Sequence, residues 1–272
     1  MKMKIKNFRK ILLEEINAHG KSVVAVYFIL RFLVILCMIL EFLRGDWNNA
    51  FLCLLSLILF LMPFFIEKKF KIDLPNTLEI IILLFIFSAE ILGEINNFYA
   101  IIPHWDTMLH TLNGFLCGAV GFSLVDLLNR NTKSINLSPL FILIVSFCFS
   151  MTIGVLWEFF EYTADNSVLN LDMQKDKIVS KISSVKINEE KENIPIVIDN
   201  IEYTIIYHKD KDNNIIETKI NNGYLDIGLH DTMKDLGVNF IGALVFSIFG
   251  YLYILNRDKY HFINNFIPIG RT

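Results

Sequence analysis

Long blocks of apolar residues, separated by short polar segments, run through most of the chain. Each block approaches the roughly 20 residues that cross a bilayer core as an α-helix. The six blocks cover residues 22–43, 49–66, 78–95, 106–129, 139–163 and 231–255. They are continuous and do not alternate with period two, so they predict helices and not the strands of a membrane barrel. The predicted fold class is an all-α polytopic membrane protein with about six transmembrane helices and a small extracytoplasmic β-rich insertion.

One polar segment is much longer than the others. Residues 166–230 are rich in Lys, Glu, Asp and Asn, and the part from 194 to 220 holds short runs of β-branched and aromatic residues. Because the turn-forming residues Asp199-Asn200 and Asp212–Asn214 separate these runs, the segment predicts two or three antiparallel strands. We expect the stretch 176–193 to be either disordered or a poorly ordered linker.

The chain is therefore expected to have five parts. These are a basic segment at 1–21, helices one to five in 22–165, the insertion at 166–230, the sixth helix at 231–256 and a tail at 257–272. In the first part, Ile5, Phe8, Leu12 and Ile16 recur at helical spacing among lysines. This pattern fits either an amphipathic helix on an anionic leaflet or a solvated basic tail.

The composition agrees with a membrane protein. The chain is 54% hydrophobic and only 19% charged, whereas soluble domains carry about 25% charged residues. This argues against a soluble enzyme, a disordered chain and a disulfide-rich secreted domain. The net charge of −3 argues against a strongly basic nucleic-acid binder. Membrane lipid is the expected partner, no nucleic acid is expected, and protein partners are not identified by the sequence.

Lysine and arginine residues gather in alternate loops. They occupy the N-terminal segment, the loop of Lys68, Lys69 and Lys71, the loop of Arg130 and Lys133, and the C-terminal tail. The loop 44–48 holds one arginine, and 95–106 holds neither residue type. Since basic loops stay on the cytoplasmic side, the sequence predicts a multi-pass protein of the cell (inner) membrane with both termini in the cytoplasm.

Ionisable residues gather where this orientation places the outer ends of four helices. Candidate metal ligands are Asp106, His110, Glu158, Asp231 and Asp235; candidate catalytic residues are Glu158 and Glu161; further candidate binding residues are Glu94, His104, Asn113, Asp165 and Asn239. Most are spaced three or four apart and so share a helix face. Carboxylates near hydrocarbon are costly and usually mark a functional site.

A bound divalent cation would stabilise such a group of acids. Mixed Asp, Glu and His ligands suit Zn²⁺, Mn²⁺ or Fe²⁺, and an all-oxygen subset suits Mg²⁺ or Ca²⁺. Two structural explanations compete with a metal site. Asp106 and Asp231 each open a predicted helix, where N-capping alone explains an aspartate. Glu158, His110 and Asp235 are also compatible with a plain interhelical hydrogen-bond cluster.

The leading functional hypothesis is a metal site at the outer membrane face that supports hydrolysis or transfer on a lipid or envelope substrate. The chain contains no HExxH, GxSxG, phosphate-binding or dinucleotide-binding motif, so the sequence leaves open whether it is an enzyme. One alternative is an ion- or proton-coupled transporter that uses the same carboxylates. Another is a non-catalytic membrane component that binds a partner through its outer insertion.

Small residues on the later helices predict how these helices pack. Gly114 and Gly118 are four apart, a spacing that permits close helix contact, and Gly154 leaves room on the next helix. We therefore expect the fourth, fifth and sixth helices to pack together there.

The motifs around these residues resemble the YjdF-like family of uncharacterised bacterial membrane proteins. They are HWDTMLHTLNG (104–114), WEFFEYTAD (157–165), LDMQKD (171–176) and GYLDIGLHDTMKDLGVNFIGA (223–243). The resemblance implies that the stretch near 177–222 is an insertion, and the family supplies no established reaction. More distantly, the order of Asp106 and His110, a later Glu158 or Glu161, and Asp235 with Asn239 and Gly242 is similar to VanZ-like proteins, although the Gln and Arg of that pattern are missing here.

Overall fold

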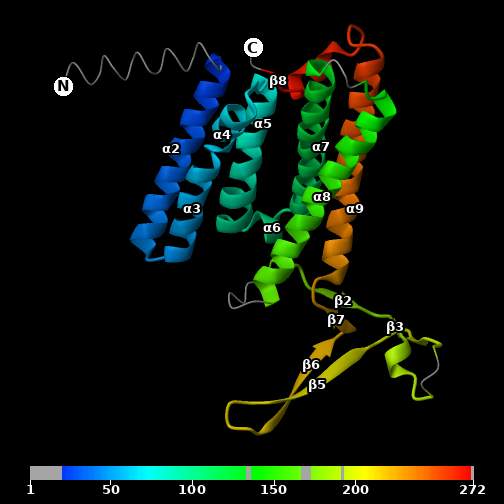
Figure 1. The fold of residues 1–272 in the computed structure, drawn as a ribbon. Coiled ribbons are helices and arrows are strands. Elements are labelled where there is room, and N and C mark those ends of the chain that lie inside the picture. Colours follow the sequence, from blue (N-terminus) through cyan, green and yellow to red (C-terminus); the bar gives the residue numbers. More distant parts are fainter. Residues whose placement is uncertain (1–19, 133–135, 167–172, 191–192, 271–272) are drawn as a thin grey trace. The chain divides into compact units, whose positions relative to one another are not determined.

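The computed structural model describes residues 20–132, 136–166, 173–190 and 193–270 (Figure 1). The chain divides into two compact units. A helical unit comprises Met1–Val155 and Asp235–Thr272, and a strand unit comprises Leu156–Lys234. The predicted amphipathic segment at 1–21 lies almost entirely outside the described residues.

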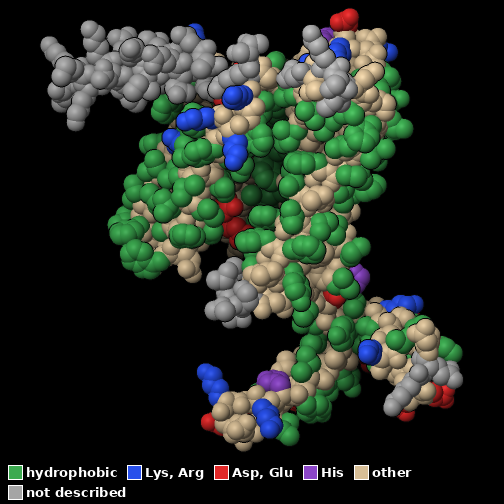
Figure 2. All heavy atoms as spheres, in the orientation of Figure 1, with side chains coloured by type: hydrophobic (Ala, Val, Ile, Leu, Met, Phe, Trp, Pro, Cys, Tyr) green, Lys and Arg blue, Asp and Glu red, His purple; other side chains and the backbone are tan. Residues whose placement is uncertain are grey.

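The all-α membrane fold is confirmed. Within the described residues, five helical segments are long and apolar enough to cross a membrane. They are α2 (Lys21–Arg44), α3 with α4 (Trp47–Leu59 and Met62–Phe70), α7 (Trp105–Asn131), α8 (Pro139–Asn166) and α9 (Leu229–Leu255). Figure 2 shows that hydrophobic side chains cover most of the helical surface, and aromatic examples such as Phe32 are largely exposed. Lipid-facing surfaces have this composition because hydrocarbon does not penalise exposed apolar groups.

The predicted span at 78–95 has a different form. It consists of α5 (Asn76–Ile86), which continues directly into the π-helical turn η1 (Phe87–Ile95), and the short α6 (Phe98–Ile101) follows. The wider π-helical winding changes the hydrogen-bonding pattern of the backbone. One carbonyl in it, that of Ser88, accepts a hydrogen bond from the Trp105 indole at 3.2 Å.

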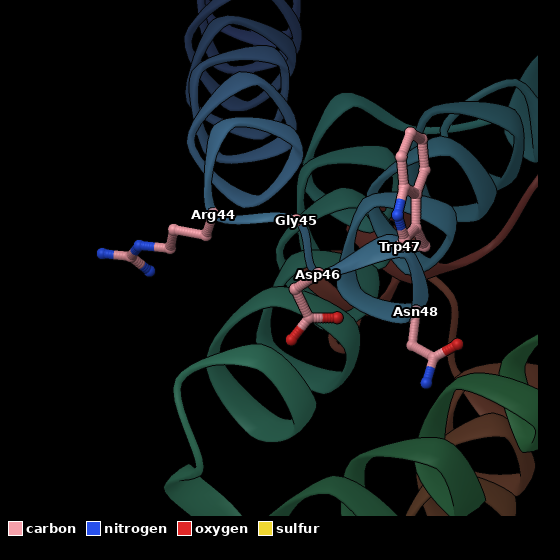
Figure 3. A pocket seen from close by; sticks show the side chains of 5 residues that line it. All are labelled: Arg44, Gly45, Asp46, Trp47 and Asn48. Carbon is pink, nitrogen blue, oxygen red and sulfur yellow. The ribbon is translucent and has the colours of Figure 1, made fainter.

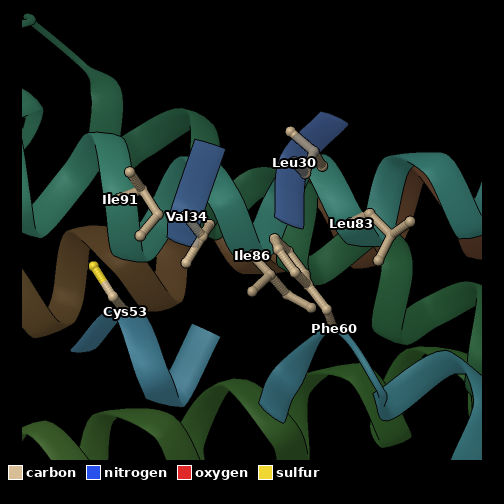
Figure 4. Close-up of a cluster of buried hydrophobic side chains, with 7 residues drawn as sticks. All are labelled: Leu30, Val34, Cys53, Phe60, Leu83, Ile86 and Ile91. Atoms are coloured by element: carbon tan, nitrogen blue, oxygen red, sulfur yellow. The ribbon is translucent and has the colours of Figure 1, made fainter. Parts of the chain in front are cut away.

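Three hydrophobic clusters hold the described part of the helical unit together. The first joins α2, α3, α5 and η1 through the side chains labelled in Figure 4, which are Leu30, Val34, Cys53, Phe60, Leu83, Ile86 and Ile91. The second lies on α7, α8 and α9 around Phe122, Ile142 and Phe246, all fully buried. A third cluster joins α5 to α7 through Leu78 and Leu116, so the earlier and the later helices also pack against each other.

Close packing of α7, α8 and α9 through small residues is confirmed. A Cβ atom on Gly114 would meet the carbonyl oxygen of Asn239, and one on Gly242 would meet that of Thr111. Serine side chains on α8 also donate to α7, since Ser150 bonds the Gly114 carbonyl at 2.7 Å. Gly154 likewise leaves room for the Asn239 amide.

The far end of α7 is tied to the segment after α9 by a buried carboxylate. Asp126 is 1% exposed and lies 2.9 Å from Arg130 and 2.8 Å from Arg257. Burial alone would lower the pKa of Arg257, but its hydrogen bond to Asp126 raises that pKa above its ordinary value. The predicted tail then folds back through η3 (His261–Phe266) to β8 (Ile269–Gly270), which pairs with β1 (Ile72–Asp73).

The strand unit contains the predicted antiparallel strands, and more of them than expected. In the described part of this unit, six strands form three two-stranded sheets, in which β2 pairs with β7, β3 with β4, and β5 with β6. Their bounds are β2 Lys177–Val179, β3 Ile182–Ser184, β4 Ile196–Ile198, β5 Tyr203–Lys209, β6 Ile215–Asn221 and β7 Tyr224–Asp226. The expectation of a disordered or poorly ordered stretch at 176–193 is wrong for the residues that the structure describes there, because they include β2, β3 and the turn η2 (Val185–Ile187); residues 191–192 lie outside the described residues.

Asparagines and aspartates make the turns, as predicted. Asn200 and Asn213 adopt left-handed backbone conformations, with φ of 53° and 63°, which asparagine tolerates better than most residues. In the β5–β6 turn, the Asp210 carboxylate accepts hydrogen bonds from the backbone of Asn214 and Asp212. The bond from Asn214 is the main reason that the pKa of Asp210 is lowered.

Candidate metal centre

Two carboxylates and one imidazole from α7 and α9 converge in the helical unit. His110 Nε2 lies 3.3 Å from Asp106 Oδ1 and 4.0 Å from Asp235 Oδ2. One ligand atom from each residue lies within 4.8 Å of the others, and all three residues are buried. No other set of three or more His, Cys, Asp and Glu ligand atoms in the described ranges comes this close together.

The local sequence explains this convergence. Asp106 is in the first turn of α7, and His110 follows it by one turn on the same face. Asp235 is brought from α9 because glycines let the two backbones approach each other, as Gly114 and Gly242 show. The i to i+4 spacing and the small-residue spacing together therefore build the cluster.

A layer of amides lies one helical turn further along α7 and α9. Asn113 Nδ2 donates to Asn239 Oδ1 at 3.2 Å, and Asn239 Nδ2 contacts the Met151 sulfur on α8 at 3.6 Å. Asn239 is 1% exposed. The structure thus brings these two predicted residues together, where they join three helices through buried polar contacts.

Two other predicted residues bind backbone groups of the strand unit. Asp165 accepts hydrogen bonds from the backbone amides of Met173 and Gln174, at 2.7 and 2.9 Å. Asp231 accepts one from the Lys175 amide at 2.9 Å and lies 3.4 Å from the Lys234 ammonium. These aspartates hold the segment just before β2, and the role of Asp231 as a metal ligand stays a prediction.

The remaining candidates differ in exposure. Glu158 and Glu161, in the part of α8 that belongs to the strand unit, are 4% and 8% exposed. Glu161 accepts a hydrogen bond from the Trp157 indole at 2.8 Å. By contrast, Glu94 and His104 are exposed, and His104 precedes α7 with a left-handed φ of 63°. The metal-binding role of Glu158, the catalytic roles of Glu158 and Glu161, and the binding roles of Glu94 and His104 stay predictions.

A surface hollow lies away from this chemistry. It is lined by the end of α2, the connecting turn and the start of α3, namely Arg44, Gly45, Asp46, Trp47 and Asn48 (Figure 3). Asp46 begins α3 there by accepting a hydrogen bond from the Asn49 amide. The hollow includes none of the candidate site residues.

The buried pairing of Asp126 was missed from the sequence. Its partner Arg130 is four residues away on α7, which is a recognisable signal. Its other partner, Arg257, is 131 residues away along the chain, and no local spacing reveals that contact.

The chemistry of Asp106, His110 and Asp235 suits a small divalent cation. Zinc binds imidazole nitrogen and carboxylate oxygen at about 2.0–2.2 Å, so two ligand atoms on one ion must lie within about 4 Å of each other. The observed separations, up to 4.8 Å, need only small side-chain shifts to reach this. Three protein ligands would leave a coordination position for water or substrate.

Comparison with known proteins supports the membrane assignment. Residues 23–184 match the family of predicted membrane proteins DUF2238. An uncharacterised protein of Thermotoga maritima is 26% identical over 113 residues, which is 42% of this chain and 57% of the relative. The chain thus spans little more than half the length of that relative. No solved structure matches the chain. Because the family match covers more than half of the residues, the chain belongs to the DUF2238 family of predicted membrane proteins.

Proposed function

We propose that Asp106, His110 and Asp235 hold a divalent metal ion, with Zn²⁺ or Mn²⁺ preferred and Mg²⁺ or Ca²⁺ as weaker alternatives. The observation that carries this proposal is the burial of the two carboxylates beside an imidazole, with all ligand atoms within 4.8 Å. Two buried aspartates repel each other, and a cation offsets that repulsion. One neutral imidazole ligand favours transition metals over Mg²⁺ and Ca²⁺.

We infer that this centre serves hydrolysis or transfer on a lipid or lipid-linked envelope substrate. A bound ion would supply an activated water molecule at neutral pH. Asp106 and His110 would fix the ion to α7, Asp235 would fix it to α9, and the Asn113–Asn239 pair would hold the two helices in register. Glu158 and Glu161 stay the candidate general bases on sequence grounds. The resemblance to the YjdF-like family, and the distant one to VanZ-like proteins, likewise stay predictions.

Metal analysis of the purified full chain tests the metal site. We expect close to one equivalent of metal in the unmodified protein, and at least a tenfold lower content in Asp235→Asn and in His110→Ala. Matched controls are Asp258→Asn and His208→Ala, because both residues are exposed and lie outside the cluster. Equal metal content in all variants, or none in the unmodified protein after metal-supplemented growth, would overturn the metal proposal.

We also propose how the chain is oriented in the membrane. We infer that both termini face the cytoplasm of an inner membrane and that the strand unit faces outward, since basic residues gather in alternate loops. In Lys211→Cys, a membrane-impermeant maleimide should label the β5–β6 turn in intact spheroplasts. In Asp258→Cys, labelling should require permeabilised membranes. The unmodified chain, whose cysteines lie within helices, gives the background, and the reverse labelling pattern would contradict this orientation.

A further inference from the structure

The β5–β6 hairpin has two open edges. It forms a two-stranded sheet to which no third strand is added within the described residues, and both of its faces are largely exposed, with Ile215 at 73%. An isolated two-stranded hairpin is marginally stable in water. An open edge also presents unpaired N–H and C=O groups, to which another strand can add.

The hydrogen-bond pattern shows which backbone groups face the open edge of β6. Asp210 N–H donates to the Asn214 carbonyl, and Asn222 N–H donates to the Glu202 carbonyl. In an antiparallel pair, hydrogen-bonded and non-hydrogen-bonded positions alternate. The opposed Thr218 and Ile206 are therefore a hydrogen-bonded pair, so the backbone of Thr218 faces β5. The backbone groups of its two neighbours, Glu217 and Lys219, face the open edge.

The residues of β6 are complementary to a reversed copy of the same strand. In an antiparallel pairing centred on Thr218, Glu217 lies opposite Lys219 of the second copy, and Lys219 lies opposite its Glu217. On the other face, Ile216 lies opposite Ile220. Opposite charges and β-branched pairs directly across two strands are stabilising.

The open edge of β5 is less complementary to a reversed copy of itself than the open edge of β6 is. An equivalent pairing centred on Ile206 would place Ile205 opposite Tyr207 and Tyr203 opposite Lys209. It contains no pair of opposite charges. Charge complementarity therefore selects the β6 edge.

We propose that β6 binds β6 of a second copy of this chain, in an antiparallel register centred on Thr218. The two hairpins then form one four-stranded sheet, and the interface is isologous. The backbone of Glu217 in each copy is hydrogen-bonded to that of Lys219 in the other. Thr218 lies on the twofold axis as a non-hydrogen-bonded pair, the position at which side chains come closest.

Cysteine cross-linking of the full chain in membranes tests this register. Under mild oxidation, Thr218→Cys should give a disulfide-linked dimer, at least fivefold more abundant than in the unmodified chain and reversible by thiol. Ile216→Cys and Ile220→Cys are the matched controls. Each would lie about 14 Å along the strand from its own copy, so neither should cross-link alone. Equal cross-linking of all three variants would mean random collision and would overturn the proposal.

A charge exchange tests the same contact without cysteine. Glu217→Lys should weaken dimer formation about tenfold, because two attractive pairs become repulsive. The double variant Glu217→Lys, Lys219→Glu should restore it, and light scattering of the purified protein measures both. If the unmodified protein is monomeric, the proposal is overturned. This holds also if a different protein binds the β6 edge. A double variant that dimerises no better than the single one would likewise overturn it.

Discussion

At the residue scale, the closest helix contact in the helical unit depends on Gly242. A methyl group there would meet the backbone carbonyl of Thr111, which cannot move without shifting α7. We predict that Gly242→Ala destabilises the protein by about 2 kcal/mol, because overpacking at a rigid contact costs this much. Thermal unfolding in detergent measures the change.

Gly237 provides the matched control on the same helix. A Cβ atom on Gly237 would meet nothing within 4 Å, so Gly237→Ala should leave stability unchanged or raise it by up to about 1 kcal/mol through helix propensity. If Gly242→Ala and Gly237→Ala change the stability equally, α7 and α9 do not make a close contact at Gly242.

At the element scale, the sequence located the long helices well. The predicted blocks at 106–129 and 139–163 correspond to Trp105–Asn131 and Pro139–Asn166. Long apolar blocks are reliable because each is explained by its own length and composition. The strands β2 and β3 were missed for the opposite reason. Each has three residues, and each is stabilised by a distant partner, as Lys177 opposite Asp226 shows.

The same distinction applies to the candidate site. Asp106 and His110 were predictable as neighbours because a four-residue spacing fixes their proximity on one helix. The approach of Asp235 to His110 was predictable because Asp231, Asp235 and Asn239 share one face of α9 and because glycines permit close packing of α7 and α9. The backbone partners of Asp165 and Asp231 were not predictable, because they depend on where a loop segment folds back.

At the scale of the whole molecule, the two compact units suggest that much of the insertion is dispensable for the helices. Val179 and Tyr224 are opposed partners of β2 and β7, so a two-residue Asn-Gly turn can replace residues 180–223. We predict that this shortened chain unfolds at a temperature close to that of the full chain and keeps its metal content, but no longer dimerises.

This replacement tests separately whether the insertion is needed for the stability of the helices, for metal binding and for dimer formation. It leaves in place the hydrogen bonds of Asp165 and Asp231 to the backbone of Met173–Lys175. Removing Met173–Lys175 instead is the contrasting variant. It should lower the unfolding temperature although the deletion is far smaller, because the half-buried carboxylates of Asp165 and Asp231 lose their backbone donors. If the shortened chain folds but holds no metal, the insertion takes part in metal binding. If the shortened chain holds metal and still dimerises, the dimer contact lies on the helices.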